Sequence, residues 1–165
     1  MLQFGARGYP PPPSRDPLYA FGHGLSYTTF TYGHFTVPDT VEAGAPVEIS
    51  VTVGNTGNRA GEEVGQLYLT DEEASAPVPI RSLQGLRRIH LEAGEVRRVT
   101  FTLSPRQLSL VTDDGERVLE AGWFRVSVGG RQPHRMEPFQ GATSGVVTGR
   151  FQIIETPRSG KEPGR

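Results

Sequence analysis

The chain has 165 residues, no cysteine and a formal net charge of −1, from 17 basic and 18 acidic residues. This length is enough for one domain that buries a core without cross-links, and the lack of cysteine excludes a disulfide framework and thiol chemistry. The near-neutral charge excludes the electrostatic footprint of a nucleic-acid or anionic-membrane binder, and no apolar run approaches the ~18 residues of a membrane span.

Residues 1–16 predict a proline-rich leader without a core. Residues 10–13 are all proline, which favours an extended polyproline conformation and removes backbone donors. We interpret the leader as a stiff spacer and not as a ligand for a proline-binding module, because nothing else suggests signalling. Residues 1–4 lack the basic start and the apolar block of a signal peptide, so the chain as written is expected to be cytoplasmic; a start further upstream would leave the compartment open.

Residues 17–30 form the most particular stretch, ending in Phe-Gly-His-Gly-Leu-Ser-Tyr-Thr-Thr-Phe. Gly22 and Gly24 permit backbone angles that are closed to other residues. Aromatic residues at both ends supply large area for burial. The β-branched and aromatic residues 27–32 favour an extended chain that leads into a first strand.

Residues 31–155 alternate between apolar and polar residues, the pattern of half-buried strands. The clearest strand places Val47, Ile49, Val51 and Val53 on one face. Similar alternation recurs near residues 65–69, 89–91, 99–103, 124–128 and 147–153. Strands at this spacing, separated by turn residues and without a long helix, predict an all-β, antiparallel two-sheet sandwich of the fibronectin type III or immunoglobulin-like kind, with seven or eight strands.

The connections also carry expectations. Residues 55–58, Asn-Thr-Gly-Asn, predict a turn, because asparagine and glycine tolerate positive φ; a hairpin and a sandwich corner both fit. Residues 113–116, Asp-Asp-Gly-Glu, predict a hairpin, and Ser104 before Pro105 predicts one capped helical turn. Residues 132–145 are expected to form a flexible loop, and residues 156–165 a disordered tail.

Residues 70–82 predict an exposed loop, because they are acidic and interrupted by proline. Asp71, Glu72 and Glu73 are consecutive and would splay apart in an extended loop, so we expect solvated carboxylates and not a metal or substrate site. The four histidines show no ligand spacing and are expected to be structural: His23, His34, His90 and His134. We therefore predict no metal site and no cofactor.

Two further groups of side chains can be interpreted either as a binding surface or as an ordinary part of the solvent-exposed face. Four arginines would make a basic stripe if their strands were neighbours, but nearby Glu92 and Glu95 favour a mixed-charge solvent face: Arg87, Arg88, Arg97 and Arg98. Trp123 alternates with the inward Phe124 and should point outward. An outward indole is a stacking platform for a sugar, a surface covered by another domain or an incidental feature; we favour cover by protein.

The sequence resembles the C-terminal region of glycoside hydrolase family 3 enzymes of the β-glucosidase and β-xylosidase type. Residues 17–30 resemble the segment that ends their catalytic part, and a fibronectin type III-like domain follows it in that family. The resemblance continues in order through about residue 130, in residues 55–64, 66–69, 83–86, 91–95 and 120–122.

The resemblance implies that this chain carries no catalytic residue. A retaining glycosidase needs two carboxyl groups roughly 5 Å apart, and in family 3 both lie upstream of the segment that residues 17–30 resemble. Those residues would then be a rigid connector that fixes how the sandwich docks on a catalytic domain, with six candidate docking residues: Phe21, Gly22, Gly24, Leu25, Tyr27 and Phe30. The alternative, in which His23 or Tyr27 reaches a substrate site, is less favoured because aromatic residues and glycine carry little acid–base potential.

Three functions follow from the sequence. The leading hypothesis is a non-catalytic fibronectin type III-like domain that stabilises or orients a glycoside hydrolase catalytic domain absent from this chain. A free-standing module that binds β-glucan or oligosaccharide would be favoured if Trp123 and Tyr68 lie on one exposed face. A generic immunoglobulin-like interaction domain is weakened because the specific resemblance begins before the sandwich, at Pro17.

Overall fold

The computed structural model of the chain describes residues 19–133 and 143–155; the predicted leader 1–16, the tail 156–165 and the middle of the predicted loop 132–145 lie outside these residues. The described residues contain seven strands of seven or more residues: β1 (Phe30–Thr36), β3 (Val47–Asn55), β4 (Gly61–Asp71), β5 (Ser82–Leu91), β6 (Val96–Leu103), β9 (Gly122–Gly129) and β10 (Val146–Ile154). Three shorter strands complete them: β2 (Thr40–Glu42), β7 (Leu110–Val111) and β8 (Arg117–Val118). No helix in these residues is long and apolar enough to cross a membrane.

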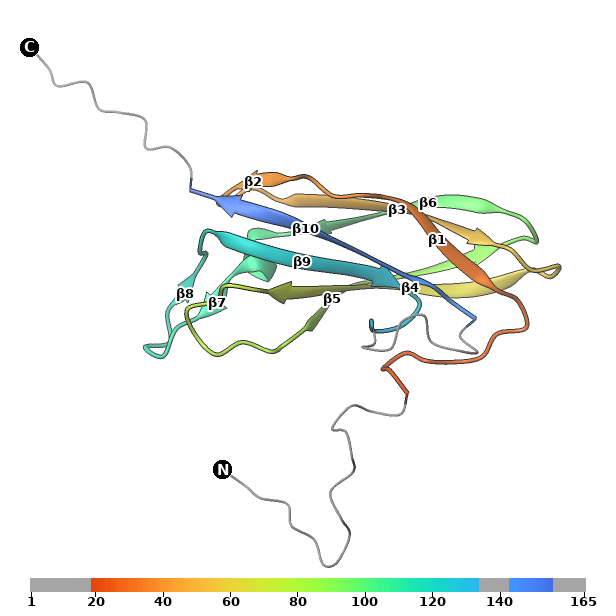
Figure 1. Ribbon diagram of the computed structural model, residues 1–165, viewed down its shortest axis with the longest axis horizontal. Coiled ribbons are helices and arrows are strands. Elements are labelled where there is room, and N and C mark those ends of the chain that lie inside the picture. Colours follow the sequence, from red (N-terminus) through yellow and green to blue (C-terminus); the bar gives the residue numbers. More distant parts are fainter. Residues whose placement is uncertain (1–18, 134–142, 156–165) are drawn as a thin grey trace, which may run out of the picture.

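The strands form a sandwich of two sheets (Figure 1). The smaller sheet has the order β1-β3-β6, the larger has the order β2-β10-β9-β4-β5, and β7 and β8 make a separate two-stranded ribbon. All long strands pair antiparallel, as predicted, but β2 runs parallel to β10, with Val41 opposite Ile153. A three-residue strand is too short to show a period in the sequence, so this pair was beyond prediction.

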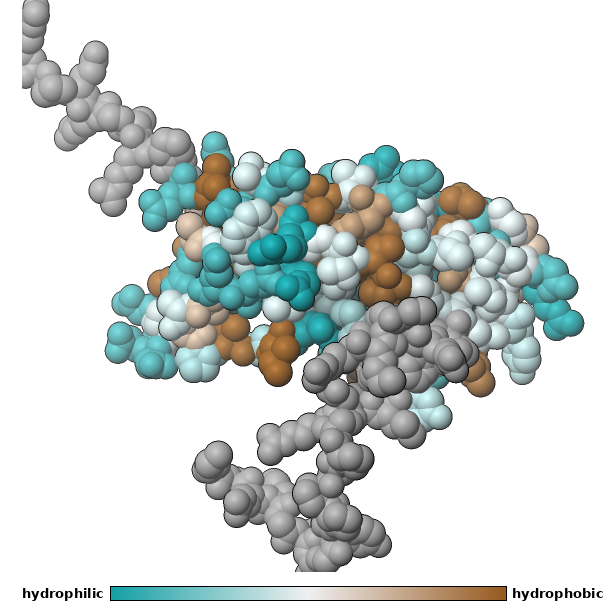
Figure 2. All heavy atoms as spheres, in the orientation of Figure 1, coloured by the Kyte–Doolittle hydropathy of each residue, from teal (hydrophilic) through white to brown (hydrophobic). Residues whose placement is uncertain are grey.

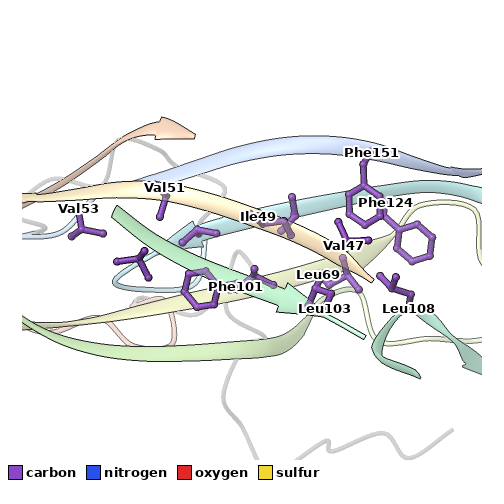
Figure 3. Packing of buried hydrophobic residues seen from close by; sticks show 14 of the residues in the cluster. Val47, Ile49, Val51, Val53, Leu69, Phe101, Leu103, Leu108, Phe124 and Phe151 are labelled. Atoms are coloured by element: carbon purple, nitrogen blue, oxygen red, sulfur yellow. The ribbon is translucent and has the colours of Figure 1, made fainter. Parts of the chain in front are cut away.

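The core lies between the two sheets and consists of the inward side chains of alternate residues. Val47, Ile49, Val51 and Val53 are at most 1% exposed, as the alternation predicted. Figure 3 shows these residues of β3 and the side chains from β4, β6, β9 and β10 that pack with them. Phe124 of β9 and Phe151 of β10 stack with ring centroids 5.5 Å apart. Each such side chain contributes roughly 1.5–3 kcal/mol through burial, which explains why alternation specifies the fold.

Two turns have predicted features, and the structure decides between the two forms that fitted a third. Ser104 caps the 3-10 helix η1 (Pro105–Leu108), and Gly115, at φ 82°, forms the turn between β7 and β8. Residues 55–58 connect β3 of the smaller sheet to β4 of the larger sheet, so they form a sandwich corner and not a hairpin. Neither Asn55 nor Gly57 has a positive φ, and among described non-glycine residues only His34 has one, at 43°.

Candidate docking surface

The connector, defined here as residues 19–29, is joined to the Asn55 corner by side-chain and backbone hydrogen bonds. The Thr28 hydroxyl donates to Asn55 Oδ1 at 2.5 Å, and the Thr56 backbone N–H donates to the Thr29 carbonyl at 2.8 Å. A Cβ on Gly57 would overlap the Thr28 side chain, so this glycine serves a close approach between two segments. The connector and the turn at residues 55–58, which the sequence analysis treated separately, are therefore in contact.

Asn55 itself is 2% exposed and organises the corner with its amide. Its Nδ2 donates to the carbonyls of Arg59 and Leu91 at 2.7 and 3.2 Å, while Oδ1 also accepts from the Gly57 N–H at 3.1 Å. An asparagine is required here because the corner needs donors and an acceptor on one short side chain. These hydrogen bonds fix the end of the connector against the corner, immediately before the first strand begins.

The first part of the connector lies on the outer face of the larger sheet, over β4. Gly22 has φ 80°, and a Cβ at this position would overlap the Gln66 amide. The Phe21 carbonyl accepts from the Gln132 N–H at 2.8 Å, and His23 N–H closes a turn onto the Ala20 carbonyl at 2.9 Å. Of the two connector glycines, only Gly22 uses a positive φ; Gly24 does not, and an added Cβ there meets no atom of the described residues within 4 Å.

The side chains of the connector differ sharply in exposure. Phe30, the first residue of β1, is 1% exposed and belongs to the core of the sandwich. Phe21, Leu25 and Tyr27 are 66%, 83% and 95% exposed, respectively. Apart from the two glycines, the predicted docking residues therefore divide into one core residue and three large side chains that the described part of the chain leaves uncovered.

A groove of about 490 Å³ lies between the connector and the outer face of β4 and β5. Residues 21–26 form one wall, and Val64, Leu83 and Leu86 line the other side. These three apolar residues are 40%, 38% and 52% exposed. We call this groove and the side chains of Phe21, Leu25 and Tyr27 the connector surface. An uncovered apolar surface of this kind is typical of a protein–protein contact.

The two aromatic candidates for a sugar contact, Tyr68 and Trp123, both point to the outer face of the larger sheet. Tyr68 is only 5% exposed, and its hydroxyl donates to Gln66 Oε1 at 2.6 Å. Trp123 is half-buried and lies under the guanidinium of Arg150, which is 4.6 Å from the ring centroid. The two rings thus do not make one exposed aromatic face.

Charged side chains surround Trp123 on this face, and Figure 2 shows hydrophilic residues gathered over the middle of β9 and β10. The Glu72 carboxylate contacts Arg125 and lies 2.8 Å from Arg150 Nε, and Glu73 accepts from the Trp123 N–H at 3.1 Å. The prediction of splayed, solvated carboxylates was therefore wrong for Glu72, whose side chain is 16% exposed. Pairing with arginines of β9 and β10 draws this part of the loop onto the sheet.

The four arginines of β5 and β6 lie in different sheets, and two of them pair with carboxylates. Arg88 pairs with Glu62 across the β4–β5 ladder, and Arg97 pairs with Glu95. Arg87 lies over the Phe101 ring, 5.8 Å from its centroid, and Arg98 donates to the Ser50 hydroxyl at 2.7 Å. These contacts divide the four arginines among different partners, so they do not form one basic stripe.

The most strongly buried carboxyl group among the described residues is that of Glu63, which points between the sheets and is 7% exposed. Its Oε1 accepts from the Tyr32 hydroxyl at 2.8 Å and from the Ser144 hydroxyl. Burial raises the pKa of Glu63, although both hydrogen bonds act in the opposite direction. Residues 19–133 and 143–155 contain no group of three or more His, Asp or Glu residues arranged to hold a metal ion.

The chain is similar to the C-terminal part of much larger enzymes. Residues 63–132 match the family profile of the fibronectin type III-like domain. The chain is 41% identical over 116 residues to a β-xylosidase of Formosa agariphila and 39% identical over 116 residues to the β-glucosidase BoGH3A of Bacteroides ovatus. These matches cover 70% and 68% of this chain but only 16% and 15% of the relatives.

Solved structures give the same result. A β-glucosidase from Erythrobacter marinus superimposes with a TM-score of 0.72 at 35% identity, over 84% of this chain and 17% of that enzyme. A β-glucosidase from Listeria innocua, crystallised in complex with glucose, matches with a TM-score of 0.72 at 31% identity, over 83% of this chain and 18% of the enzyme. The similarity includes the arrangement of the sandwich and not only its sequence motifs.

Proposed function

Because the chain contains a fibronectin type III-like domain homologous to the C-terminal regions of family 3 β-glucosidases and β-xylosidases, we propose that it is a non-catalytic accessory domain. Its role is to stabilise or orient a glycoside hydrolase catalytic domain, which occupies the same polypeptide in the relatives. The residues that make the contact are those of the connector surface.

The observation that carries this proposal is the exposure of Phe21, Leu25 and Tyr27 on a connector whose backbone is fixed. Side chains of this size are normally buried, and burying each on association would contribute about 1.5–3 kcal/mol before the entropy of association is subtracted. In family 3 enzymes the segment that residues 17–30 resemble ends the catalytic part, which precedes the fibronectin type III-like domain. The connector surface is therefore suitably placed for contact with that preceding part.

Activity assays on the purified chain test the non-catalytic role. We expect no hydrolysis of chromogenic β-glucoside or β-xyloside and no binding heat with soluble glucans in calorimetry. Turnover that survives repurification would contradict the proposal, because it would require a carboxylate pair of the retaining or inverting type. Binding without turnover would instead support a carbohydrate-binding module, and Trp123→Ala would then locate the site.

A chimera tests the accessory role directly. In the Listeria innocua β-glucosidase, the C-terminal region matched by this chain would be replaced by residues 19–155 and, separately, deleted. We expect the chimera to resist thermal inactivation better than the deletion, with a longer half-life of activity on a chromogenic glucoside. A Tyr27→Ser, Leu25→Ser chimera should lose this gain, while an Ile80→Ser chimera, altered at an apolar residue that is 88% exposed outside the connector, should keep it.

A further inference from the structure

Two residues on the outer face of β4 are buried, although the alternation of the strand would leave them exposed to solvent. Its outward residues are Glu62, Val64, Gln66 and Tyr68, since Leu67 and Leu69 point into the core. Glu62 and Val64 are exposed, as expected for an outer face, but Gln66 and Tyr68 are only 6% and 5% exposed. Something other than the opposite sheet must cover this pair.

The cover over Gln66 is the connector together with residues 130–133. Gly22 lies directly on the Gln66 amide, with no room for a Cβ between them. Gln66 Nε2 donates to the Gly130 carbonyl at 2.9 Å, and its Oε1 accepts from the Tyr68 hydroxyl at 2.6 Å. Both ends of the amide are thus engaged, and its plane forms a platform under the connector backbone.

Residues 130–133 bind the connector backbone, and Arg81 in turn binds residues 130–133. The Gln132 N–H donates to the Phe21 carbonyl at 2.8 Å, and Arg81 Nη1 donates to the Pro133 carbonyl at 2.8 Å. The connector backbone is therefore enclosed between Gln66 below and Gln132 beside it. The side chains of Phe21 and Leu25 nevertheless remain 66% and 83% exposed.

We propose that Gln66 and Tyr68 are positioning residues, which hold the connector in the one conformation that presents Phe21 and Leu25 as a preformed surface to the catalytic domain. This inference rests on the proposed accessory function for the identity of the partner. Its physical advantage is that the connector is ordered before association, so that less conformational entropy is lost when the catalytic domain binds. A glutamine suits the position because its amide accepts from Tyr68 and donates to Gly130 at the same time.

Hydrogen exchange on the full chain tests the positioning role without any partner. The probes are the amides of His23 and Gln132, which donate to the Ala20 and Phe21 carbonyls. Gln66→Ala should speed exchange at both by about tenfold or more, while the Val51 amide in the central strand β3 keeps its protection. Tyr68→Phe, which removes only the hydroxyl that donates to Gln66, should produce a smaller change at the same two amides.

Gln152→Ala is the matched control. Gln152 points outward from the same sheet, opposite Trp123 on β9, so it tests the loss of a glutamine from this face away from the connector. It should leave the His23 and Gln132 amides unchanged. Equal exchange rates in Gln66→Ala and wild type would overturn the positioning role, because Gln66 would then not hold the connector. Exchange that is equally faster at Val51 would also overturn it, because it would show general destabilisation of the fold.

The Listeria chimera separates this inference from the proposed function. If Gln66→Ala speeds exchange at His23 and Gln132 and also shortens the half-life of the chimera, while leaving its initial turnover unchanged, the positioning role in docking is supported. If exchange changes but the half-life does not, the role in presenting the surface is refuted. If the wild-type chimera is no more stable than the deletion, the accessory function fails, whereas the exchange result still decides whether Gln66 holds the connector.

Discussion

Asn55 shows how one residue type can serve several backbone segments. Its amide contacts Thr28, Gly57, Arg59 and Leu91, which lie on the connector, in the corner and at the end of β5. The sequence predicted a turn here from residues that tolerate a positive φ, although the asparagine does not have one. Local propensity identifies a turn, whereas the partners of a buried amide depend on segments up to 36 residues away.

Asn55→Ala should be strongly destabilising, because it leaves the Thr28 hydroxyl and buried carbonyl groups without their partner. We expect a loss of about 2–3 kcal/mol in the free energy of unfolding. Urea denaturation followed by Trp123 fluorescence measures it. Asn58→Ala, an exposed asparagine in the same corner, is the control and should change stability by less than about 0.5 kcal/mol. Equal effects of the two variants would contradict the role given to the Asn55 amide.

Glu63 predicts a pH dependence of stability. Its pKa is raised in the folded state by burial, so folding favours the protonated carboxyl group. This stability is complete below the ordinary pKa of glutamate and is lost as the pH rises through the raised pKa of the folded state. Glu63→Gln keeps an acceptor for Tyr32 and Ser144 without a charge. It should therefore match or fall below wild type at about pH 4 and become relatively more stable as the pH rises to about 8.

Urea titrations of both proteins across this pH range measure the difference. The expected change in relative stability is about 1.4 kcal/mol for every tenfold difference between the acid dissociation constants of Glu63 in the folded and unfolded chains. Comparing the two proteins isolates Glu63, because Asp71, whose pKa is also raised mainly by burial, is present in both. A stability difference that stays constant with pH would show that the Glu63 carboxyl group has the same pKa in the folded and unfolded chains.

At the scale of the elements, alternation predicted the inward faces of β3, β6 and β9 correctly, because their core contacts follow from a period of two. The same alternation placed Gln66 and Tyr68 on the outer face but could not predict their burial. The cover over Gln66 comes from Gly22 and Gly130, which are 44 and 64 residues away from it. Of the site, the sequence could therefore identify the connector residues, but not the platform beneath them or the groove beside them.

Glycine substitutions distinguish a position against which the connector packs, Gly57, from an open position within the connector, Gly24. Gly57→Ala should destabilise the chain by about 2 kcal/mol, because its Cβ would overlap Thr28 and push the connector away from the corner. Gly24→Ala should be neutral or stabilising by up to about 1 kcal/mol, since its φ is not positive and space around it is open among the described residues. Thermal unfolding measures both, and a marked loss in Gly24→Ala would show that the motif constrains this position in another way.

For the whole molecule, the uncovered connector side chains predict self-association of the isolated chain. Tyr27 is 95% exposed, so Tyr27→Ser should leave the free energy of unfolding within about 0.5 kcal/mol of wild type. It should nevertheless reduce concentration-dependent association, as measured by sedimentation velocity, because it removes apolar area from the connector surface. Ile80→Ser serves as the control at an exposed apolar side chain that does not line the connector surface. An equal reduction in both variants would mean that exposed apolar area in general, and not the connector surface, drives association.

The hydrogen bonds from Thr28 to Asn55 and from Gln132 to Phe21 also determine which segment can be transferred from one protein to another as a unit. The first strand begins at Phe30, yet a boundary drawn there would separate Asn55 from Thr28 and residues 130–133 from the backbone they hold. The modular unit of recombination therefore starts before the sandwich, at Tyr19 or earlier. Domain exchanges among the β-glucosidase and β-xylosidase relatives should therefore succeed when the connector is transferred together with the sandwich. Residues 28 and 55 should be transferred as a pair.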